Sequence, residues 1–265
     1  MEVIPDAGDL MPIAKTLAYG AHPDAVADIH LPATSGPAPL IVFLHGGFWR
    51  SIVNRKYAEP VADTLAAAGY VVANVEYRRT GGGGGWPVTF TDVARAFDTL
   101  PALIEREWPG LADPERIVYV GHSAGGQLGI WGTLRHRLPL GAPGRTETPP
   151  RVAGVVALAP VADLATAYAL GSGEGAVADL LEGGPDVYPD RYAALDPSTL
   201  GPSPVPVVVV HGDQDQRVPI AMGRDYCAAT GAELIELPGI GHFELADPAS
   251  AAWPPIAAAV RRLAG

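Results

Sequence analysis

The chain has 265 residues, of which 48% are hydrophobic and 18% are charged. This balance excludes an intrinsically disordered protein and supplies ample apolar material for a buried core. The formal net charge of -11 repels phosphate backbones and anionic membrane surfaces, so nucleic acids and lipid head groups are poor candidate partners. We expect a globular protein with a single domain over residues 1–265 and a small, neutral substrate.

The cysteine content and the N-terminus bear on the compartment. Cys227 is the only cysteine in the sequence, so an intrachain disulfide is excluded and folding does not depend on oxidation. Residues 1–20 carry acidic residues where a secretory signal has a basic segment and an apolar run, and no stretch is long enough for a membrane span. A cytoplasmic protein without membrane association is predicted. The two lysines against sixteen arginines are typical of a GC-rich bacterial gene.

Short apolar runs rich in β-branched residues alternate with Ala-rich segments along the chain. Two weak strands are expected first, as an antiparallel entry to a sheet, at residues 16–19 and 26–31. Stronger, doubly buried strands are expected at residues 40–44, 70–75, 117–120, 152–158, 205–210 and 234–237. Helices are expected at residues 57–68, 91–107, 124–137, 220–230 and 249–263. This alternation predicts an α/β fold with a mostly parallel sheet of about eight strands and helices on both faces.

Two segments interrupt this alternation. Residues 160–204 separate two strands by more chain than one crossover helix requires, and they contain several glycines and prolines. Long connections of this kind are typical of lids and binding loops, and the alternative is a surface excursion with one or two helices of its own. A second Gly-rich segment, TGGGGGW at residues 80–86, follows the end of another strand, and we expect it to be mobile.

The strongest chemical signal is VYVGHSAGG at residues 118–126, where a β-branched strand leads into G-x-S-x-G and then into an apolar helix. This motif places the serine on a tight strand-to-helix turn, which requires glycine on both sides of it. The helix N-terminus beneath the turn favours developing negative charge. Ser123 is therefore the predicted nucleophile, and a chance turn is the alternative.

An earlier strand leads into HGGFW at residues 45–49. The glycines allow backbone N–H groups to turn toward the nucleophile, where they would stabilise an oxyanion. We expect the donors to be the N–H groups of Gly47, Phe48 and Ala124. The alternative is a Gly-rich turn that merely ends a buried strand.

The predicted strand at residues 205–210 is followed by HGDQDQRVP. A carboxylate just beyond this strand end can reach the same edge of the sheet, so either Asp213 or Asp215 could orient a catalytic histidine. The alternative is that both carboxylates cap the helix that starts near Pro219.

The last predicted strand is followed by PGIGHFE, which places His242 on a loop that glycine allows to bend back over the sheet. Its imidazole can accept the serine proton and later protonate the leaving group. A serine, an acid and a histidine in this order along the chain match the α/β-hydrolase arrangement. The other histidines are expected at the surface or sheet edge (His22, His30, His136) or in structural roles beside the motifs (His45, His122, His211).

Together, HGGFW, GHSAGG, HGDQD and the final GH resemble the α/β-hydrolases of the esterase/lipase group from about residue 40 to the C-terminus. In the HG-x-x-D-x-x-VP pattern of that group the last acid is the triad member, so the resemblance implies Asp215. HGGFW, together with Glu76-Tyr77-Arg78 at the next strand end, is similar to arylformamidases, also called kynurenine formamidases. That finer resemblance implies N-formyl-kynurenine or another aryl formamide as substrate.

These observations predict a serine hydrolase that forms an acyl-enzyme and requires no metal or organic cofactor. Trp49 and Trp86 are candidates for the walls of the substrate pocket, with core or rim packing as the alternative. His122 is a further candidate substrate contact. Two other functions remain open, a peptidase or amidase of the prolyl-oligopeptidase type and a non-catalytic ligand receptor. The expected partner is a small molecule, and a homodimer remains open.

Overall fold

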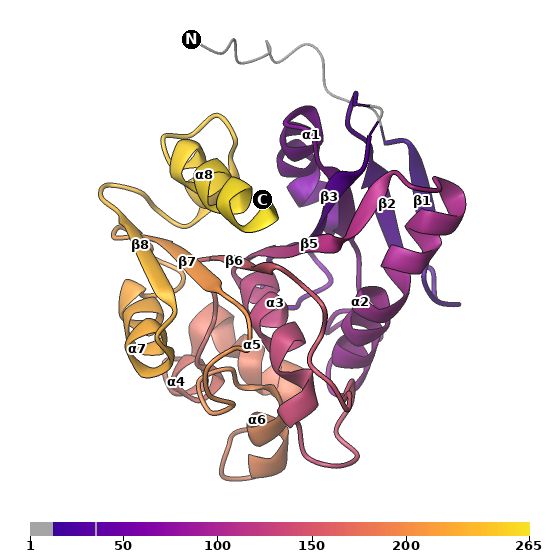
Figure 1. Ribbon diagram of the computed structural model, residues 1–265. Coiled ribbons are helices and arrows are strands. Elements are labelled where there is room, and N and C mark those ends of the chain that lie inside the picture. The colour runs from indigo at the N-terminus through magenta and orange to yellow at the C-terminus, as the bar shows by residue number, and fades with distance from the viewer. Residues whose placement is uncertain (1–12, 35) are drawn as a thin grey trace.

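The computed structural model describes residues 13–34 and 36–265 (Figure 1). Its centre is an eight-stranded sheet in the order β1-β2-β4-β3-β5-β6-β7-β8. The strands are β1 (Lys15–Ala18), β2 (Val26–His30), β3 (Ala38–Leu44), β4 (Val71–Val75), β5 (Ala112–His122), β6 (Gly154–Leu158), β7 (Val207–Gly212) and β8 (Glu233–Leu237). β2 is antiparallel to both β1 and β4, and all other neighbours are parallel. The antiparallel entry and the mostly parallel sheet are confirmed.

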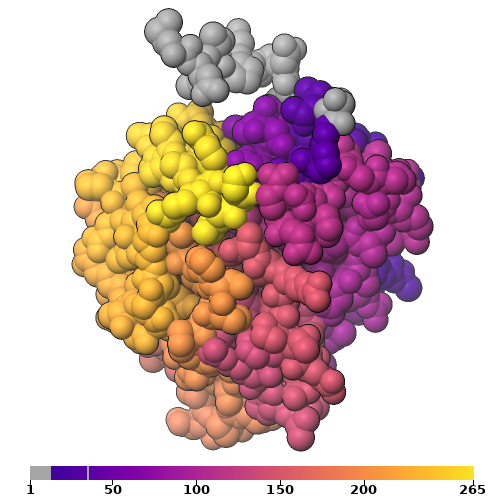
Figure 2. All heavy atoms as spheres, viewed as in Figure 1, coloured from indigo at the N-terminus to yellow at the C-terminus, as the bar shows by residue number. Residues whose placement is uncertain are grey.

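Helices cover both faces of this sheet, as predicted (Figure 1). One face carries α1 (Glu59–Ala67) and α8 (Trp253–Ala264), and the other carries α2 (Val88–Glu107), α3 (Ala124–Leu134) and α7 (Ile220–Thr230). The space-filling view shows the C-terminal residues beside the purple N-terminal third on the first face (Figure 2). Among the described residues, no helix is both long and apolar enough to cross a membrane. Residues 1–12, which carry much of the segment used to predict the compartment, lie outside the described residues.

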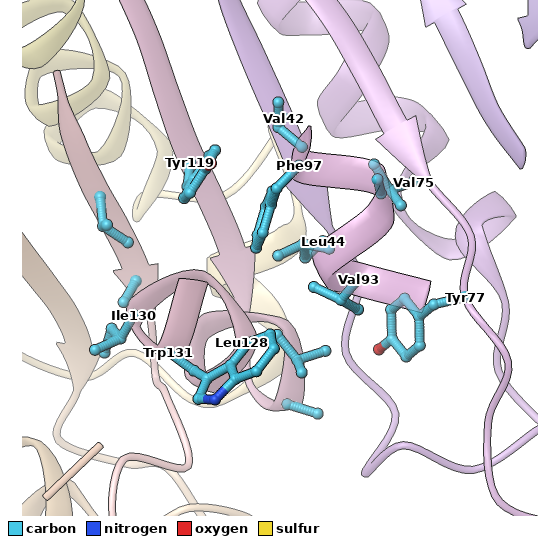
Figure 3. Close-up of a cluster of buried hydrophobic side chains, with 14 of the residues drawn as sticks. Val42, Leu44, Val75, Tyr77, Val93, Phe97, Tyr119, Leu128, Ile130 and Trp131 are labelled. Atoms are coloured by element: carbon cyan, nitrogen blue, oxygen red, sulfur yellow. The ribbon is translucent and has the colours of Figure 1, made fainter. Parts of the chain in front are cut away.

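The two faces are held by separate apolar clusters because successive side chains of a strand point to opposite sides. In β3, Ile41 and Phe43 pack under α1 and α8. Val42 and Leu44 of the same strand pack with the helices of the opposite face. Figure 3 shows this second cluster, in which Phe97 of α2 lies against side chains of the sheet and of α3. A strand buried on both faces accounts for the continuous apolar runs in the sequence.

Residues 160–204 form three short helices, α4 (Leu164–Ala169), α5 (Ser172–Leu181) and α6 (Pro189–Leu195), so the expectation of one or two was too low. The start of α5 is irregular, because Gly173, Glu174 and Gly175 all have positive φ, at 59°, 57° and 82°. Two of these three positions are glycines, which adopt such a backbone at little cost. The turn packs on the HGGFW segment, since a Cβ at Gly173 would lie 2.6 Å from the ring of Phe48.

His30 is buried, so the expectation that it lies at the surface or sheet edge is wrong. It ends β2, which has β1 outside it, and its side chain is fully buried. Its Nδ1 lies 2.6 Å from Asp63 Oδ1 on α1. A charged partner on a neighbouring helix, which no local pattern reveals, is what makes this buried position tolerable for a histidine.

The parallel strands bring the predicted site residues to one edge of the sheet. In the register, Leu44 at the end of β3 pairs with Gly121, and Gly212 at the end of β7 pairs with Leu237. The loops that follow β3, β5, β7 and β8 therefore emerge side by side. Ligand sites of open α/β sheets lie at this edge, beyond the carboxyl ends of the strands.

Candidate active site

Ser123 occupies the turn between β5 and α3 with φ 57° and ψ −117°. Its N–H donates to the Leu158 carbonyl at 2.7 Å, and its carbonyl accepts from the Gln127 N–H at 3.2 Å. A non-glycine residue in such a conformation costs about 1–3 kcal/mol and persists only where the surroundings fix it. The bonds to β6 and α3 supply that constraint.

The flanking glycines are required by the close approach of backbones. A Cβ at Gly121 would lie 2.2 Å from the Gly125 carbonyl oxygen, and a Cβ at Gly125 would lie 2.0 Å from that of Leu44. No side chain fits at either distance. The same packing brings the serine to the HGGFW segment, because a Cβ at Gly46 would lie 3.2 Å from the Cβ of Ser123.

The HGGFW segment forms an unusual turn, with φ of 107° at Gly47, 49° at Phe48 and 54° at Trp49. Positive φ is uncommon at aromatic residues and marks a backbone that its surroundings hold in place. Within residues 13–34 and 36–265, the N–H groups of Gly47, Phe48 and Ala124 donate to no other protein group. These are the three donors that the sequence predicted for an oxyanion hole.

Asp215 and His242 are brought together, with 2.6 Å between Asp215 Oδ2 and His242 Nδ1. The other carboxylate oxygen accepts the N–H groups of Arg217 and Val218 at 2.7 and 2.8 Å. Burial by itself raises the pKa of Asp215, but the hydrogen bonds of His211, His242 and the Val218 backbone outweigh it and lower the pKa well below its usual range. The carboxylate therefore stays ionised and fixes the histidine tautomer with Nδ1 protonated.

Asp213 does not reach the histidine. It is exposed, and its Oδ1 accepts the Gly239 N–H at 2.7 Å, which ties the loop after β8 to the loop after β7. Neither aspartate caps α7, because its N-cap is Pro219 and no side chain bonds there. The helix-capping alternative is therefore wrong, and Asp215 is the carboxylate paired with His242.

His122 takes the structural role that was one of the two expected for it, because both ring nitrogens bind protein groups. Nε2 lies 3.0 Å from the His242 carbonyl oxygen and Nδ1 lies 3.2 Å from the Tyr57 hydroxyl. A carbonyl only accepts, so Nε2 carries the proton and Tyr57 donates to Nδ1. Burial, and then the nearby His242, lower the pKa of His122 to about 3. Among the described residues, Ser123 Oγ and His242 form no hydrogen bond with each other. His122, which directly precedes Ser123, instead binds the His242 backbone carbonyl.

His211 is a supporting residue that the sequence did not assign to the site. It is fully buried, its Nε2–H donates to the Val218 carbonyl at 3.0 Å, and the same nitrogen lies 3.4 Å from Asp215 Oδ2. The next residue, Gly212, allows the His242 loop to approach, since a Cβ there would lie 2.1 Å from the Ile240 carbonyl oxygen. The His-Gly pair that precedes Asp215 in the sequence is the signal that could have pointed to His211.

The two tryptophans have different environments. Trp49 is fully buried in the core, so core packing is the alternative that holds and a role in the pocket wall is not supported. Trp86 is half-buried, and its backbone N–H donates to the Leu180 carbonyl of α5 at 2.8 Å. The Arg191 guanidinium of α6 lies 5.7 Å from the Trp86 ring centroid. Trp86 thus joins the Gly-rich loop to residues 160–204.

A cavity of about 510 Å³ lies away from these residues, at the amino ends of β7 and β8, where Val207, Glu233 and Arg262 contribute to its lining. This is the opposite edge of the sheet from Ser123. In the described chain no group of three or more His, Cys, Asp or Glu side chains is arranged to hold a metal ion.

Known proteins share both the sequence pattern and the fold. The chain matches the BD-FAE family over residues 27–228. It is 31% identical over 208 residues to the probable carboxylic ester hydrolase LipM of Mycobacterium tuberculosis, covering 72% of this chain and 44% of that protein. It spans about half the length of the curated relatives it matches.

Solved structures agree on the fold. A truncated carbohydrate esterase from gut microbiota superposes with a TM-score of 0.79 at 20% identity, over 97% of this chain and 98% of that one. An esterase from Thermogutta terrifontis superposes with a TM-score of 0.72 at 22% identity, over 95% and 91% of the two chains. The chain belongs to the BD-FAE family and has the α/β-hydrolase fold.

Proposed function

We propose that this protein is a serine hydrolase that cleaves carboxylic esters through an acyl-enzyme. The observation that carries the proposal is the buried Asp215–His242 pair, 2.6 Å apart, at the same sheet edge as the strained Ser123 turn. The names of its relatives support the reaction, since LipM is called a probable carboxylic ester hydrolase and LipC of the same organism, 25% identical, an esterase. A ligand receptor would have no need of a strained serine at the same sheet edge as a histidine paired with an ionised aspartate.

In the proposed mechanism, Ser123 Oγ attacks the ester carbonyl while His242 Nε2 takes the hydroxyl proton. Asp215 holds Nδ1–H and stabilises the imidazolium that forms. The N–H groups of Gly47, Phe48 and Ala124 stabilise the oxyanion, and each such donor is worth about a hundredfold to a thousandfold in rate. His242 then protonates the departing alcohol, and a water, activated by the same ring, releases the acid and restores Ser123.

The net charge and the names of the relatives bear on the substrate class. The net charge of -11 disfavours anionic substrates. The relatives named above are ester hydrolases, which favours esters over aryl formamides and peptides. We propose that residues 160–204 contribute one wall of the substrate site, because their turn at Gly173 packs on Phe48 and Asp179 binds Arg50 at 2.8 Å. A cytoplasmic location and a homodimer remain predictions from the sequence.

A fluorophosphonate probe tests the nucleophile directly. We expect stoichiometric labelling, with the modified peptide containing Ser123, and no labelling of Ser123→Ala. Labelling that survives Ser123→Ala would remove this residue from the mechanism, and a wild-type protein that resists the probe would favour the ligand receptor.

A substrate panel then decides the leaving-group chemistry. It should compare p-nitrophenyl esters of several acyl lengths with N-formyl-kynurenine and an aminoacyl anilide. We expect the esters to have the highest kcat/KM. A preference for the formamide would support the arylformamidase alternative, and a preference for the anilide would support the peptidase alternative.

A further inference from the structure

A second buried histidine–carboxylate pair lies behind the proposed oxyanion turn. His45 directly follows β3 and Glu76 directly follows β4, and both are buried, with 0% and 1% of their surface exposed. His45 Nε2 lies 2.9 Å from Glu76 Oε1, and His45 Nδ1 lies 2.7 Å from the carbonyl oxygen of Gly46. Neither side chain has a place in the reaction proposed above.

The partners of the ring define its protonation state. A backbone carbonyl and a carboxylate both only accept hydrogen bonds. A neutral imidazole has a single N–H, so one of its two contacts would set a lone pair against a lone pair. An imidazolium donates in both directions and satisfies both. The geometry of His45 is therefore that of a cation.

The other contacts of Glu76 agree with an ionised carboxylate. It accepts the N–H groups of Arg55 and Tyr77, each at 3.0 Å, and the Arg79 guanidinium lies 3.0 Å away. Burial raises the pKa of Glu76, but the His45 hydrogen bond and charge, followed by the Arg55 N–H and Arg79, lower it further than burial raises it. Three donors other than His45 already point at the two oxygens of Glu76, which favours its ionised form.

The charges that face this pair balance only if His45 is protonated. Arg55 binds Asp28 at 2.6 Å and Arg79 binds Asp24 at 3.3 Å. Together with Glu76, these residues give three carboxylates against two guanidiniums, and an imidazolium makes the cluster neutral. Buried charges are tolerated when they are paired and hydrogen-bonded. Two tyrosines also contact the pair: the Tyr77 ring stacks on His45 with centroids 4.6 Å apart, and the Tyr19 hydroxyl donates to the Glu76 carbonyl.

We propose that His45 is a protonated positioning residue that strengthens Gly47 N–H as an oxyanion donor. The carbonyl of Gly46 and the N–H of Gly47 belong to one peptide group. A charged donor at that carbonyl draws electron density toward the oxygen and makes the N–H at the other end of the peptide more acidic. The same bond fixes the peptide plane and so aims the N–H. The catalytic part of this inference rests on the function proposed above, whereas the protonation state does not.

Nitrogen-15 NMR of the ring tests the protonation state without any variant. For His45 we expect both ring nitrogens to carry a proton at neutral pH, where a free histidine is mostly neutral. His30 is an internal comparison: it also binds a buried carboxylate, but its Nε2 is buried without a partner in the described chain. A single protonated nitrogen on His45 at neutral pH would overturn the inference, whatever the activity of the enzyme.

Glu76→Gln tests the effect on the oxyanion donor, because it keeps the shape and removes the charge that holds the proton. We expect kcat to fall by about tenfold to a hundredfold with little change in KM, measured against the wild type at the same pH. The Gly47 amide proton should move upfield. Asp63→Asn, which disrupts the His30–Asp63 pair, should leave kcat and the Gly47 resonance unchanged.

The outcomes separate the two proposals. An unchanged kcat and Gly47 resonance in Glu76→Gln, with His45 deprotonated, would refute the polarisation. A wild-type protein that hydrolyses no ester would refute the proposed function, and the His45 spectrum and the Gly47 shift would still decide this inference. If Glu76→Gln prevents folding, the wild-type NMR measurement decides it alone.

Discussion

Two buried histidine–carboxylate pairs stand on either side of Ser123, and they differ in what the second ring nitrogen faces. In the His242–Asp215 pair, no protein acceptor binds Nε2 within the described chain, so this nitrogen can act as a base. In the His45–Glu76 pair, Nδ1 is held by the Gly46 carbonyl, so the ring has no free site and serves as a fixed charge. A histidine and a carboxylate thus form a proton carrier in one pair and a fixed charge that polarises a peptide group in the other. The surroundings of one atom decide between these roles.

The sheet order explains why both pairs lie near one serine. Ser123 directly follows β5, which lies next to β3, and β4 lies beyond β3. On the other side of β5 lies β6, followed by β7 and β8. The parallel strands all direct their carboxyl ends to the same edge. The His45–Glu76 pair therefore approaches the Ser123 turn from one side, and the His242–Asp215 pair approaches it from the other.

Removing the ring of His242 should have the largest effect. We expect His242→Ala to lower kcat/KM for an ester by about 10⁴-fold or more, because the proton acceptor is lost, while thermal unfolding stays cooperative. Stopped-flow or steady-state ester hydrolysis measures the loss. If the variant keeps more than a tenth of the activity, His242 is not the base and the contrast with His45 disappears.

Replacing the carboxylate that orients His242 should follow in size. Asp215→Asn should lower kcat by about 10³- to 10⁴-fold, since the amide cannot hold Nδ1–H and stabilise the imidazolium. Asp213→Asn is the matched control, two residues away on the exposed side of the loop, and should change kcat by no more than a few-fold. The opposite ranking would make Asp213 the orienting acid.

His122 should make the free energy of unfolding depend on pH. Its folded pKa of about 3 lies below the ordinary 6.5, so the unfolded chain binds the proton first as the solution is acidified. The free energy of unfolding should therefore fall as pH drops from 6.5 toward 3, by at most about 1.4 kcal/mol per pH unit. Urea titrations of the wild type and of His122→Gln across this range measure the difference. Parallel curves would show that His122 is not held neutral.

A smaller effect is expected at the turn that contacts Phe48. Gly173→Ala adds a methyl group that would lie 2.6 Å from the Phe48 ring, so we expect KM and acyl-length preference to shift by a few-fold. Gly175→Ala is the control, because its φ is also positive at 82° but nothing lies within 4 Å of the added carbon. Both variants should lose about 1–2 kcal/mol of stability from backbone strain. Identical kinetics in the two would place residues 160–204 outside the substrate site.

The fold and the main site residues could be predicted because their signals are local. The strands buried on both faces are continuous apolar runs, and a mostly parallel sheet leaves few ways to connect them. G-x-S-x-G predicted a turn whose glycines are required by contacts of about 2 Å, and the structure has that turn. Asp215 could be separated from Asp213 only by resemblance, and the distance to His242 now makes the same choice.

The errors have a common cause, which is that burial and partners come from distant parts of the chain. His30 was expected at the surface or sheet edge, yet Asp63, 33 residues away, accompanies it in the interior. His122 was expected to be structural and was also a candidate substrate contact, and Tyr57 and the His242 backbone now occupy its nitrogens. Trp49 was an open choice between pocket and core, and the left-handed turn of HGGFW directs it inward.

Local sequence patterns established the kinds of chemistry at hand: a serine on a glycine-flanked turn, a histidine and two candidate acids on loops after strands, and an α/β core. These properties depend on neighbours within a few residues, where backbone sterics and periodicity act. The tertiary structure decided which acid meets His242, which histidines are enclosed, and that His45 faces two acceptors. Those outcomes depend on contacts between residues far apart in the chain, such as His45 with Glu76 and His122 with His242, which form only when the sheet brings its strand ends together.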